Sequence, residues 1–265
     1  MPAARCCRAA PAAYRSTAWC VAMKLAEQRS PELAGRAGKL LLAVPLGATE
    51  QHGPHLPVGT DTAIATELCR RLAAWLPDIV VAPALPYGSS GEHAGFSGTL
   101  SIGRAALELL VVELVRSADA FAGVVLVNGH GGNVPSLRAA VATLAEEGRA
   151  VMLWSPSGRA DDSHAGHSET SVMLFLRPDD VAKDQARPGN ARPLPELFDT
   201  IRRHGIRAVS PTGVLGDPPA PARQTVRRSL IGGPRSWSPQ HTSGSSRVRR
   251  PPDREQALGF HTADH

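Results

Sequence analysis

Short apolar runs alternate with amphipathic stretches along the first two thirds of the chain. Four of these runs, residues 40–46, 79–84, 124–127 and 150–154, are rich in Val, Leu and Ala and contain no charged residue. Uninterrupted apolar runs of this length are typical of strands that are covered on both faces of a sheet. We therefore predict four buried strands.

Three stretches between or beside these runs have helical spacing. Residues 62–76 carry apolar side chains at 64, 65, 68, 72, 73 and 76, and residues 104–118 carry them at 106, 107, 110, 111, 114 and 115. Residues 135–146 form a third such stretch. Alternating strands and helices predict a three-layer α/β/α sandwich with a mainly parallel sheet.

The two ends of the chain differ from this central part. Residues 1–24 contain four cations and no acid, and residues 217–265 are rich in Pro, Ser, Gly and Arg without helical or strand period. We predict a disordered arm or an over-long start at 1–24, with Met23 as a candidate initiator, and a disordered or anomalous tail at 217–265. A frame shift and an unrelated extension both remain open for the tail. The folded domain is then residues 25–216.

Charge and cysteine content narrow the possible partners. The net charge of +5 comes from the two ends, since residues 25–216 carry a net charge of −3. We therefore expect no nucleic acid as a partner. No apolar run approaches the roughly 18 residues of a membrane span, and the four cysteines follow no disulfide or zinc spacing. A reducing cytoplasm fits these features, although the Arg/Ser-rich start leaves a transit peptide as a minor alternative.

Candidate metal ligands follow the first predicted strand. Glu50 and His52 are two residues apart, so on an extended chain their side chains point the same way, and Asp61 comes nine residues after His52. The alternative is that these are solvated loop residues and that Asp61 caps the next helix. Mixed carboxylate and imidazole ligands suit zinc, iron(II) or manganese.

Other polar loops follow the remaining strands, which places them at the same edge of a parallel sheet. His130 lies among three glycines, which suits either a tight turn or a backbone that approaches a ligand closely, and we favour a metal ligand. The Gly/Ser-rich loop after the second strand offers candidate substrate or oligomer contacts at Ser89, Ser90 and His93.

The segment 164–171 is dense in titratable groups. A structural interpretation makes it a helix N-terminus with a capping serine and an acid in the first turn. The functional interpretation places Glu169 on a metal and His164 near the reacting bond as a proton donor, and leaves His167 structural or peripheral.

The motifs VPLGATEQHGPHLPVGTDT, PYGSSGEH, NGHGGN and HAGHSETS together resemble the creatininase family of metal-dependent amidohydrolases, from about residue 25 to 217. The resemblance implies two divalent metal ions, Fe²⁺ or Zn²⁺ with Mn²⁺ as a third candidate, and a homo-oligomer. One ion would be held by Glu50, Asp61 and His130, and the other by His52, Asp61 and Glu169. His164 matches the family's catalytic histidine, and Glu169 or a nearby carboxylate would manage the proton of the attacking water.

HAGHSETS followed by SPTGVLGD narrows the resemblance to a member that removes a C-terminal dipeptide from a modified ribosomal precursor peptide during cofactor maturation. Two positions depart from creatininase itself, because Gly131 replaces a tyrosine and Gly132 replaces a glutamate. Both departures favour a larger substrate with room at Gly131. Two alternatives stay open: hydrolysis of a small cyclic amide or formamide, and a non-catalytic metal-binding subunit.

Overall fold

The computed structural model describes residues 22–157 and 160–219, so the predictions for residues 1–21 and 220–265 lie outside it. Within the described ranges the strands form one parallel sheet in the order β1-β3-β2-β4-β5. The strands are β1 (Met23–Lys24), β2 (Leu41–Leu46), β3 (Ile79–Val81), β4 (Gly123–Asn128) and β5 (Val151–Trp154). The predicted parallel sheet is confirmed.

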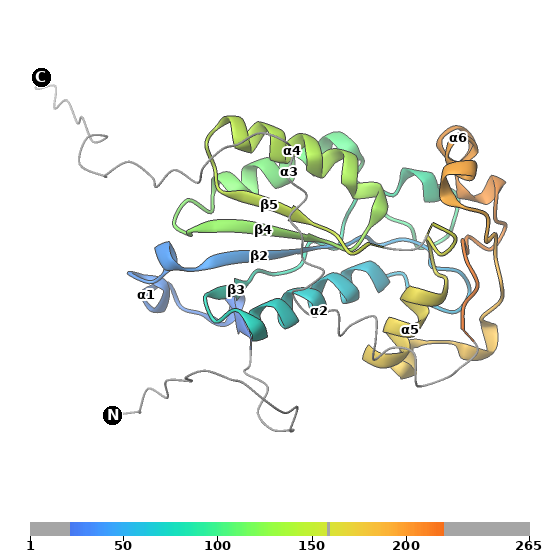
Figure 1. Ribbon diagram of the computed structural model, residues 1–265, viewed down its shortest axis with the longest axis horizontal. Helices are drawn as coiled ribbons and strands as arrows, with labels where there is room; N and C mark the ends of the chain where they lie inside the picture. The colour runs from blue at the N-terminus through green and yellow to red at the C-terminus, as the bar shows by residue number, and fades with distance from the viewer. Residues whose placement is uncertain (1–21, 158–159, 220–265) are drawn as a thin grey trace, which may run out of the picture.

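The α-helices of the described part are α1 (Ser30–Leu33), α2 (Thr60–Trp75), α3 (Arg104–Arg116), α4 (Val134–Glu146), α5 (His167–Leu176) and α6 (Leu194–His204). Helices α3 and α4 cover one face of the sheet and α2 covers the other, while α5 and α6 lie beyond the ends towards which the strands point (Figure 1). This is the predicted three-layer sandwich. None of the described helices combines the length and apolarity needed to cross a bilayer.

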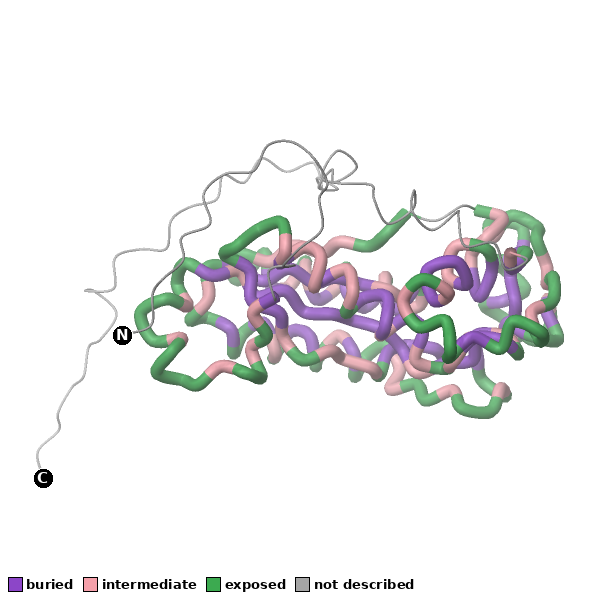
Figure 2. Tube along the Cα trace, turned by 90° about the horizontal axis from the view of Figure 1, so that it is seen from below, coloured by how far each residue is buried: buried purple, intermediate pink, exposed green. Residues whose placement is uncertain are grey.

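Alternate side chains of the central strands pack into two separate hydrophobic cores, one on each face of the sheet. Leu42 and Val44 of β2 join Leu126 of β4 in the cluster that packs against α3 and α4. Ala43 of β2 and Val125 of β4 point the other way, into the cluster packed against α2. Because a strand's side chains alternate between faces, a run that is apolar throughout is what a two-sided core requires. The sheet therefore forms the buried centre of the molecule (Figure 2).

Several boundaries differ from the sequence predictions. Met23 and Lys24 pair with β3 as an edge strand, so the ordered sheet begins inside the range 1–24 that we predict as an arm. Strand β3 ends at Val81, although the apolar run continues to residue 84. Ala82 and Leu85 still donate to carbonyls of β2, but the register shifts by one residue between Val81 and Leu85. Helix α6 has no counterpart among the predicted helices, although it buries Leu197 and Ile201 on one face.

The central position of β4 generates a stability prediction. Leu126 is fully buried in the core between the sheet and helices α3 and α4. Leu126→Ala should lower the free energy of unfolding by about 2–5 kcal/mol, because the lost packing leaves a cavity. Leu109→Ala is the control, since Leu109 is 62% exposed on α3, and it should change stability by about 0.5 kcal/mol or less. Urea unfolding measures both, and equal effects would contradict this packing.

Candidate metal centre

Loops from neighbouring strands carry the candidate ligands to one place. Strands β2 and β4 are paired up to Leu46 and Asn128, so the loops that follow them start side by side. Glu50 and His52 lie in the first loop, His130 lies in the second, and Asp61 lies in the first turn of α2. The two loops pass close against α2, since a Cβ at Gly47 would meet Thr62 Oγ1 at 2.4 Å and one at Gly129 would meet the Asp61 carbonyl at 2.6 Å.

A fourth segment enters the centre from a distant part of the chain. His164 is anchored by backbone hydrogen bonds with Leu215, in both directions. Ala165 then adopts a left-handed conformation with φ 52°, a strained geometry for a residue with a Cβ, and turns the chain into α5. The first turn of α5 places Glu169, whose Oε2 accepts a hydrogen bond from the Ala165 N–H at 2.7 Å. The strained turn thus brings His164 and Glu169 to the same centre.

Asp61 lies between two histidines at the middle of the cluster. Its Oδ1 is 3.0 Å from His52 Nε2, and its Oδ2 is 3.3 Å from His130 Nδ1. Each carboxylate oxygen therefore faces a different imidazole. This is the arrangement expected of a carboxylate shared between two ions.

Two further carboxylates, one on each side of Asp61, complete two sets of candidate metal ligands. Glu50 Oε1 lies 3.2 Å from His130 Nδ1, and Glu169 Oε2 lies 3.6 Å from His52 Nε2. The structure thus brings together all five residues that the sequence predicts as metal ligands: Glu50, His52, Asp61, His130 and Glu169. Ligand atoms of Glu50, His52 and Asp61 lie within 4.8 Å of one another, as do those of His52, His164 and Glu169.

The outer nitrogens of the two central histidines are already occupied. His52 Nδ1 lies 3.1 Å from the Glu50 carbonyl, and His130 Nε2 lies 3.0 Å from the Ser89 carbonyl. A carbonyl oxygen only accepts, so these nitrogens carry the protons. His52 Nε2 and His130 Nδ1, which face the carboxylates, are then the nitrogens that can offer a lone pair to an ion once the second proton of each ring has left. Metal-ligating histidines are usually held in this way.

The buried carboxylates give a direct test of whether cations fit this centre. Both oxygens of Glu50 and Oδ2 of Asp61 are buried without a hydrogen-bond partner. A buried, unpaired carboxylate costs several kcal/mol. Mixed oxygen and nitrogen donors around such orphaned oxygens suit divalent ions of the zinc, iron(II) and manganese type. The residues present therefore fit a pair of divalent cations.

In the metal-free protein, the negative charge of these carboxylates raises the pKa values of the neighbouring histidines. Burial opposes a charge on His52, but the Asp61 carboxylate, followed by Glu169 and Glu50, raises the pKa of His52 to about 10. Glu50 and Asp61 likewise raise the pKa of His130 despite its burial. Burial would raise the pKa of Asp61, but His52 and His130 outweigh it and lower that pKa. Metal binding should therefore release protons from the histidines.

His164 has a different electrostatic character from the two central histidines. Its Nε2 lies 2.8 Å from the Gln51 carbonyl and so carries the proton, while its Nδ1 lies 3.6 Å from Glu50 Oε1. Burial, together with the nearby charge of His52, lowers the pKa of His164 to about 3. The resting imidazole is therefore neutral with a free lone pair on Nδ1. It can donate a proton only after it has accepted one.

Glu169 is the third carboxylate of the cluster, and its side chain remains 23% exposed. Burial raises the pKa of Glu169 to about 7, aided by the charges of Asp61 and Glu50, while His52 opposes the shift. A carboxylate that titrates near neutral pH binds either a proton or a metal ion. The two compete for Glu169 around pH 7.

The candidate substrate contacts fall in two groups. Ser89, Ser90 and His93 are buried against the cluster, where Ser90 Oγ lies 3.4 Å from His130 Nε2 and His93 Nε2 lies 3.4 Å from Glu50 Oε1. Gly131 is exposed, and a Cβ there would meet nothing within 4 Å. Only Gly131 borders open space. His167, which the sequence predicts as structural or peripheral, is exposed at the start of α5.

Two residues of the centre were not identified from the sequence. Gln51 is buried, and its side chain approaches His93 and His164. Glu92 Oε1 lies 3.9 Å from His130 Nε2, and a Cβ at Gly132 would meet this oxygen at 2.3 Å. Both residues stand directly beside predicted site residues in the sequence, and that adjacency was the available signal.

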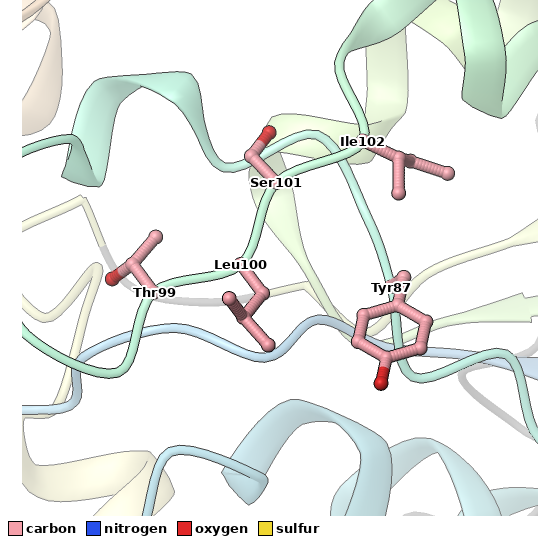
Figure 3. A pocket seen from close by; sticks show the side chains of 5 residues that line it. All are labelled: Tyr87, Thr99, Leu100, Ser101 and Ile102. Atoms are coloured by element: carbon pink, nitrogen blue, oxygen red, sulfur yellow. The ribbon is translucent and has the colours of Figure 1, made fainter.

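An open groove borders the loop that carries Glu50 and His52. It has a volume of about 510 Å³ and is lined by Tyr87, Thr99, Leu100, Ser101 and Ile102 (Figure 3). Thr99 Oγ1 accepts a hydrogen bond from the Gln51 N–H at 3.1 Å, and the Leu100 N–H donates to the Thr49 carbonyl at 2.8 Å. One wall of the groove is thus hydrogen-bonded to the metal-ligand loop.

Comparison with known proteins identifies relatives of this chain. The family model named creatininase, described as creatinine amidohydrolase, matches residues 26–228. The mycofactocin precursor peptide peptidase of Mycobacterium ulcerans (strain Agy99) is 52% identical over 187 residues, which cover 67% of this chain and 74% of that protein.

Solved structures agree with the sequence matches. The structure named creatininase Mn has a TM-score of 0.66 at 28% identity, covering 79% of this chain and 93% of that chain. A creatininase variant of the Zn–Zn type has a TM-score of 0.63 at 28% identity, covering 78% and 92%. Proteins with this fold and related sequences therefore include manganese and zinc forms.

His164 generates a pH prediction for the metal-free protein. Its pKa is lowered from 6.5 to about 3 in the folded state, so below pH 6.5 the unfolded chain takes up a proton that the folded protein does not. This stability contribution is present above pH 6.5 and is lost as the pH falls towards 3, by up to about 1.4 kcal/mol per pH unit. Removing the imidazole in His164→Asn should abolish this loss.

The free energy of unfolding of wild type minus that of His164→Asn should fall by about 2 kcal/mol between pH 7 and pH 5. Urea unfolding of both chelator-treated proteins at the two pH values measures this difference. The exposed His204 at the end of α6 provides His204→Asn as the matched control. A wild-type minus His164→Asn difference that is constant with pH would show that His164 is not held neutral by burial.

Proposed function

Because the chain belongs to the creatininase family of metal-dependent amidohydrolases, we propose that it is a peptidase acting on the mycofactocin precursor peptide. The reaction is the removal of a C-terminal dipeptide during maturation of the peptide-derived cofactor. The observation that supports this proposal most directly is the position of Asp61, whose two oxygens face two histidines in a buried cluster of carboxylates. The similarity to a precursor peptide peptidase supports the choice of substrate.

The ligand sets on the two sides of Asp61 are the proposed metal sites. Glu50, Asp61 and His130 would hold one divalent ion, and His52, Asp61 and Glu169 would hold the other. Position 132 cannot supply a carboxylate, because a Cβ there would meet Glu92 Oε1 at 2.3 Å and His130 Nε2 at 2.5 Å. Glu169 from α5 is therefore the carboxylate of the second set. We keep iron(II), zinc and manganese as candidates.

Two divalent ions, when bound, lower the pKa of water and polarise the carbonyl of the scissile amide. The chain itself supplies the movement of the proton. His164 presents its Nδ1 lone pair to the cluster, and its Nε2 proton is held by the Gln51 carbonyl at 2.8 Å. Glu169 remains the group that takes up the proton of the attacking water, and that proton passes through Nδ1 of His164 to the leaving nitrogen.

The surroundings of the centre suit a peptide better than a small ring. Gly131 leaves its side of the centre without a side chain. The neighbouring groove exposes Tyr87 and Leu100, which are 49% and 54% accessible. An apolar groove beside a polar centre can hold the peptide segment that precedes the cleaved bond. A homo-oligomer in the cytoplasm remains part of the proposal.

Replacing the shared carboxylate tests the metal-dependent reaction. Asp61→Asn keeps the shape of the side chain but removes the charge that both ligand sets share. We expect metal content below that of wild type and a loss of peptide cleavage of about 100-fold or more, since both ions lose a ligand. Elemental analysis measures the metal, and mass spectrometry measures the release of a dipeptide from a synthetic precursor peptide.

Asp78→Asn, on the exposed turn before β3, is the matched control and should keep both properties. Normal cleavage by Asp61→Asn would rule out the proposed metal scheme. Turnover of creatinine by the wild type, with the precursor peptide left intact, would instead refute the peptidase assignment while leaving the metal chemistry in place.

A further inference from the structure

Three imidazole nitrogens converge on one oxygen of Glu50. His130 Nδ1, His93 Nε2 and His164 Nδ1 lie 3.2, 3.4 and 3.6 Å from Glu50 Oε1. Glu50, His93 and His164 also have the spacing of a further metal-binding trio. What this trio does depends on which nitrogens carry protons, because a metal ligand needs a lone pair and a hydrogen-bond donor needs a proton.

The side-chain amide of Gln51 is oriented by two backbone groups. Its Oε1 accepts a hydrogen bond from the Gly53 N–H at 2.9 Å, and its Nε2 donates to the Gly213 carbonyl at 3.3 Å. A backbone N–H only donates and a carbonyl only accepts, so both contacts require the same orientation of the amide. The NH₂ group of Gln51 therefore faces His93 Nδ1 at 2.9 Å.

This orientation determines the tautomer of His93. The amide NH₂ can only donate, so His93 Nδ1 must be the acceptor and cannot carry a proton. The proton of the neutral ring is then on Nε2, which lies 3.4 Å from Glu50 Oε1 without forming a hydrogen bond in the metal-free protein. His164 does not compete for this role, because its Nε2 lies 3.2 Å from the Gln51 amide nitrogen but gives its own proton to the Gln51 carbonyl at 2.8 Å.

The four histidines of the centre thus divide into two kinds. His52, His130 and His164 each give one proton to a backbone carbonyl, so their inward nitrogens are the ones that can offer a lone pair to an ion. His93 turns a proton inward. It consequently presents no lone pair to an ion beside Glu50, although the spacing of the trio would otherwise allow one.

Gly213 explains how the Gln51 side chain reaches this position. A Cβ at Gly213 would lie 2.1 Å from Gln51 Oε1, and the residue has φ +82°, which favours glycine. Gly213 belongs to the 210–217 segment, whose residue Leu215 also anchors His164. The segment therefore holds both the amide and the catalytic histidine candidate.

We propose that Gln51 and His93 form a positioning relay for Glu50, in which the Gln51 amide holds His93 as the Nε2–H tautomer and His93 directs that proton at the Glu50 carboxylate. His93 is then neither a metal ligand nor a substrate contact. The relay rests on the proposed function only in taking Glu50 as a metal ligand. Partners of this kind orient a ligating carboxylate and tune its affinity for the ion.

The tautomer of His93 can be read directly by ¹⁵N NMR of the imidazole nitrogens. In the metal-free wild type we expect a protonated Nε2 and an unprotonated Nδ1, with the signal assigned from its loss in His93→Gln. After loading with ¹¹³Cd²⁺, His52 and His130 should show coupling to cadmium and His93 should not. Cadmium coupling to His93, or a proton on its Nδ1, would overturn the relay.

Variants test whether the relay acts on the metal. Gln51→Glu places an acceptor opposite His93 Nδ1 and should move the proton to that nitrogen. Gln51→Glu and His93→Leu should each weaken Cd²⁺ binding by about 10–100-fold, whereas His93→Gln, which keeps an N–H donor, should retain most of the affinity. His204→Leu, on the exposed end of α6, is the control for the substitution itself.

The outcomes separate this inference from the proposed function. A wild type that binds no Cd²⁺ would refute the metal centre, while the tautomer of His93 would still be readable in the metal-free protein. Unchanged affinity in both His93→Leu and Gln51→Glu, with the wild-type centre loaded, would refute the relay alone. If Gln51 only fills space, Gln51→Glu should leave the His93 proton on Nε2. A move of that proton to Nδ1 would therefore distinguish the relay from a space-filling role.

Discussion

The structure depends on the cost of collecting carboxylates in a buried place. Glu50 and Asp61 are almost fully inaccessible, and Glu169 lies against them. Within the described residues these carboxylates form ion pairs with histidines, whose charge depends on pH. Such a cluster persists only if the surrounding fold is rigid and a positive charge is supplied. The two-sided core of the sheet provides the rigidity, while protons on His52 and His130 provide charge when no ion is bound.

Much of the fold and most of the centre were predictable because one physical rule connects them. Apolar runs such as residues 40–46 favour buried strands, and parallel strands end at the same edge, so the polar residues after them are expected to meet. This rule gives no prediction for an element that is too short to show a hydrophobic period. Strand β1 has two residues, too few for any period. Helix α6 does have helical spacing, with apolar residues at 194, 197, 198 and 201, so its signal was present in the sequence but was not used.

The details that sequence could not supply concern protons and backbone geometry. Residues 164–171 start helix α5, as the structural interpretation predicts, although Gly166 rather than a serine is the N-cap. The segment also brings His164 and Glu169 to the centre, and their metal-binding and catalytic roles stay predictions. The helix start is held by Asp162, which accepts hydrogen bonds from the His167 and Ser168 N–H groups and lies outside the motif. Glu169 adds one bond at the same helix start, since its Oε2 accepts from the Ala165 N–H. The direction of the His164 proton depends on the Gln51 carbonyl, 113 residues away in sequence.

Specificity in this centre follows from which positions lack a side chain. At Gly132 a side chain is excluded, because Glu92, Ser89 and His130 already occupy its space. At Gly131 a side chain would be tolerated, and its absence leaves an opening. Under the proposed function, the first glycine leaves Glu169 of α5 as the carboxylate of the second ligand set, and the second leaves room beside the centre for a larger substrate. Groups fixed by buried hydrogen bonds can therefore coexist with open space at Gly131. In a peptide substrate the reacting amide is flanked by further residues. Such a substrate needs both a rigid centre and an open approach to it.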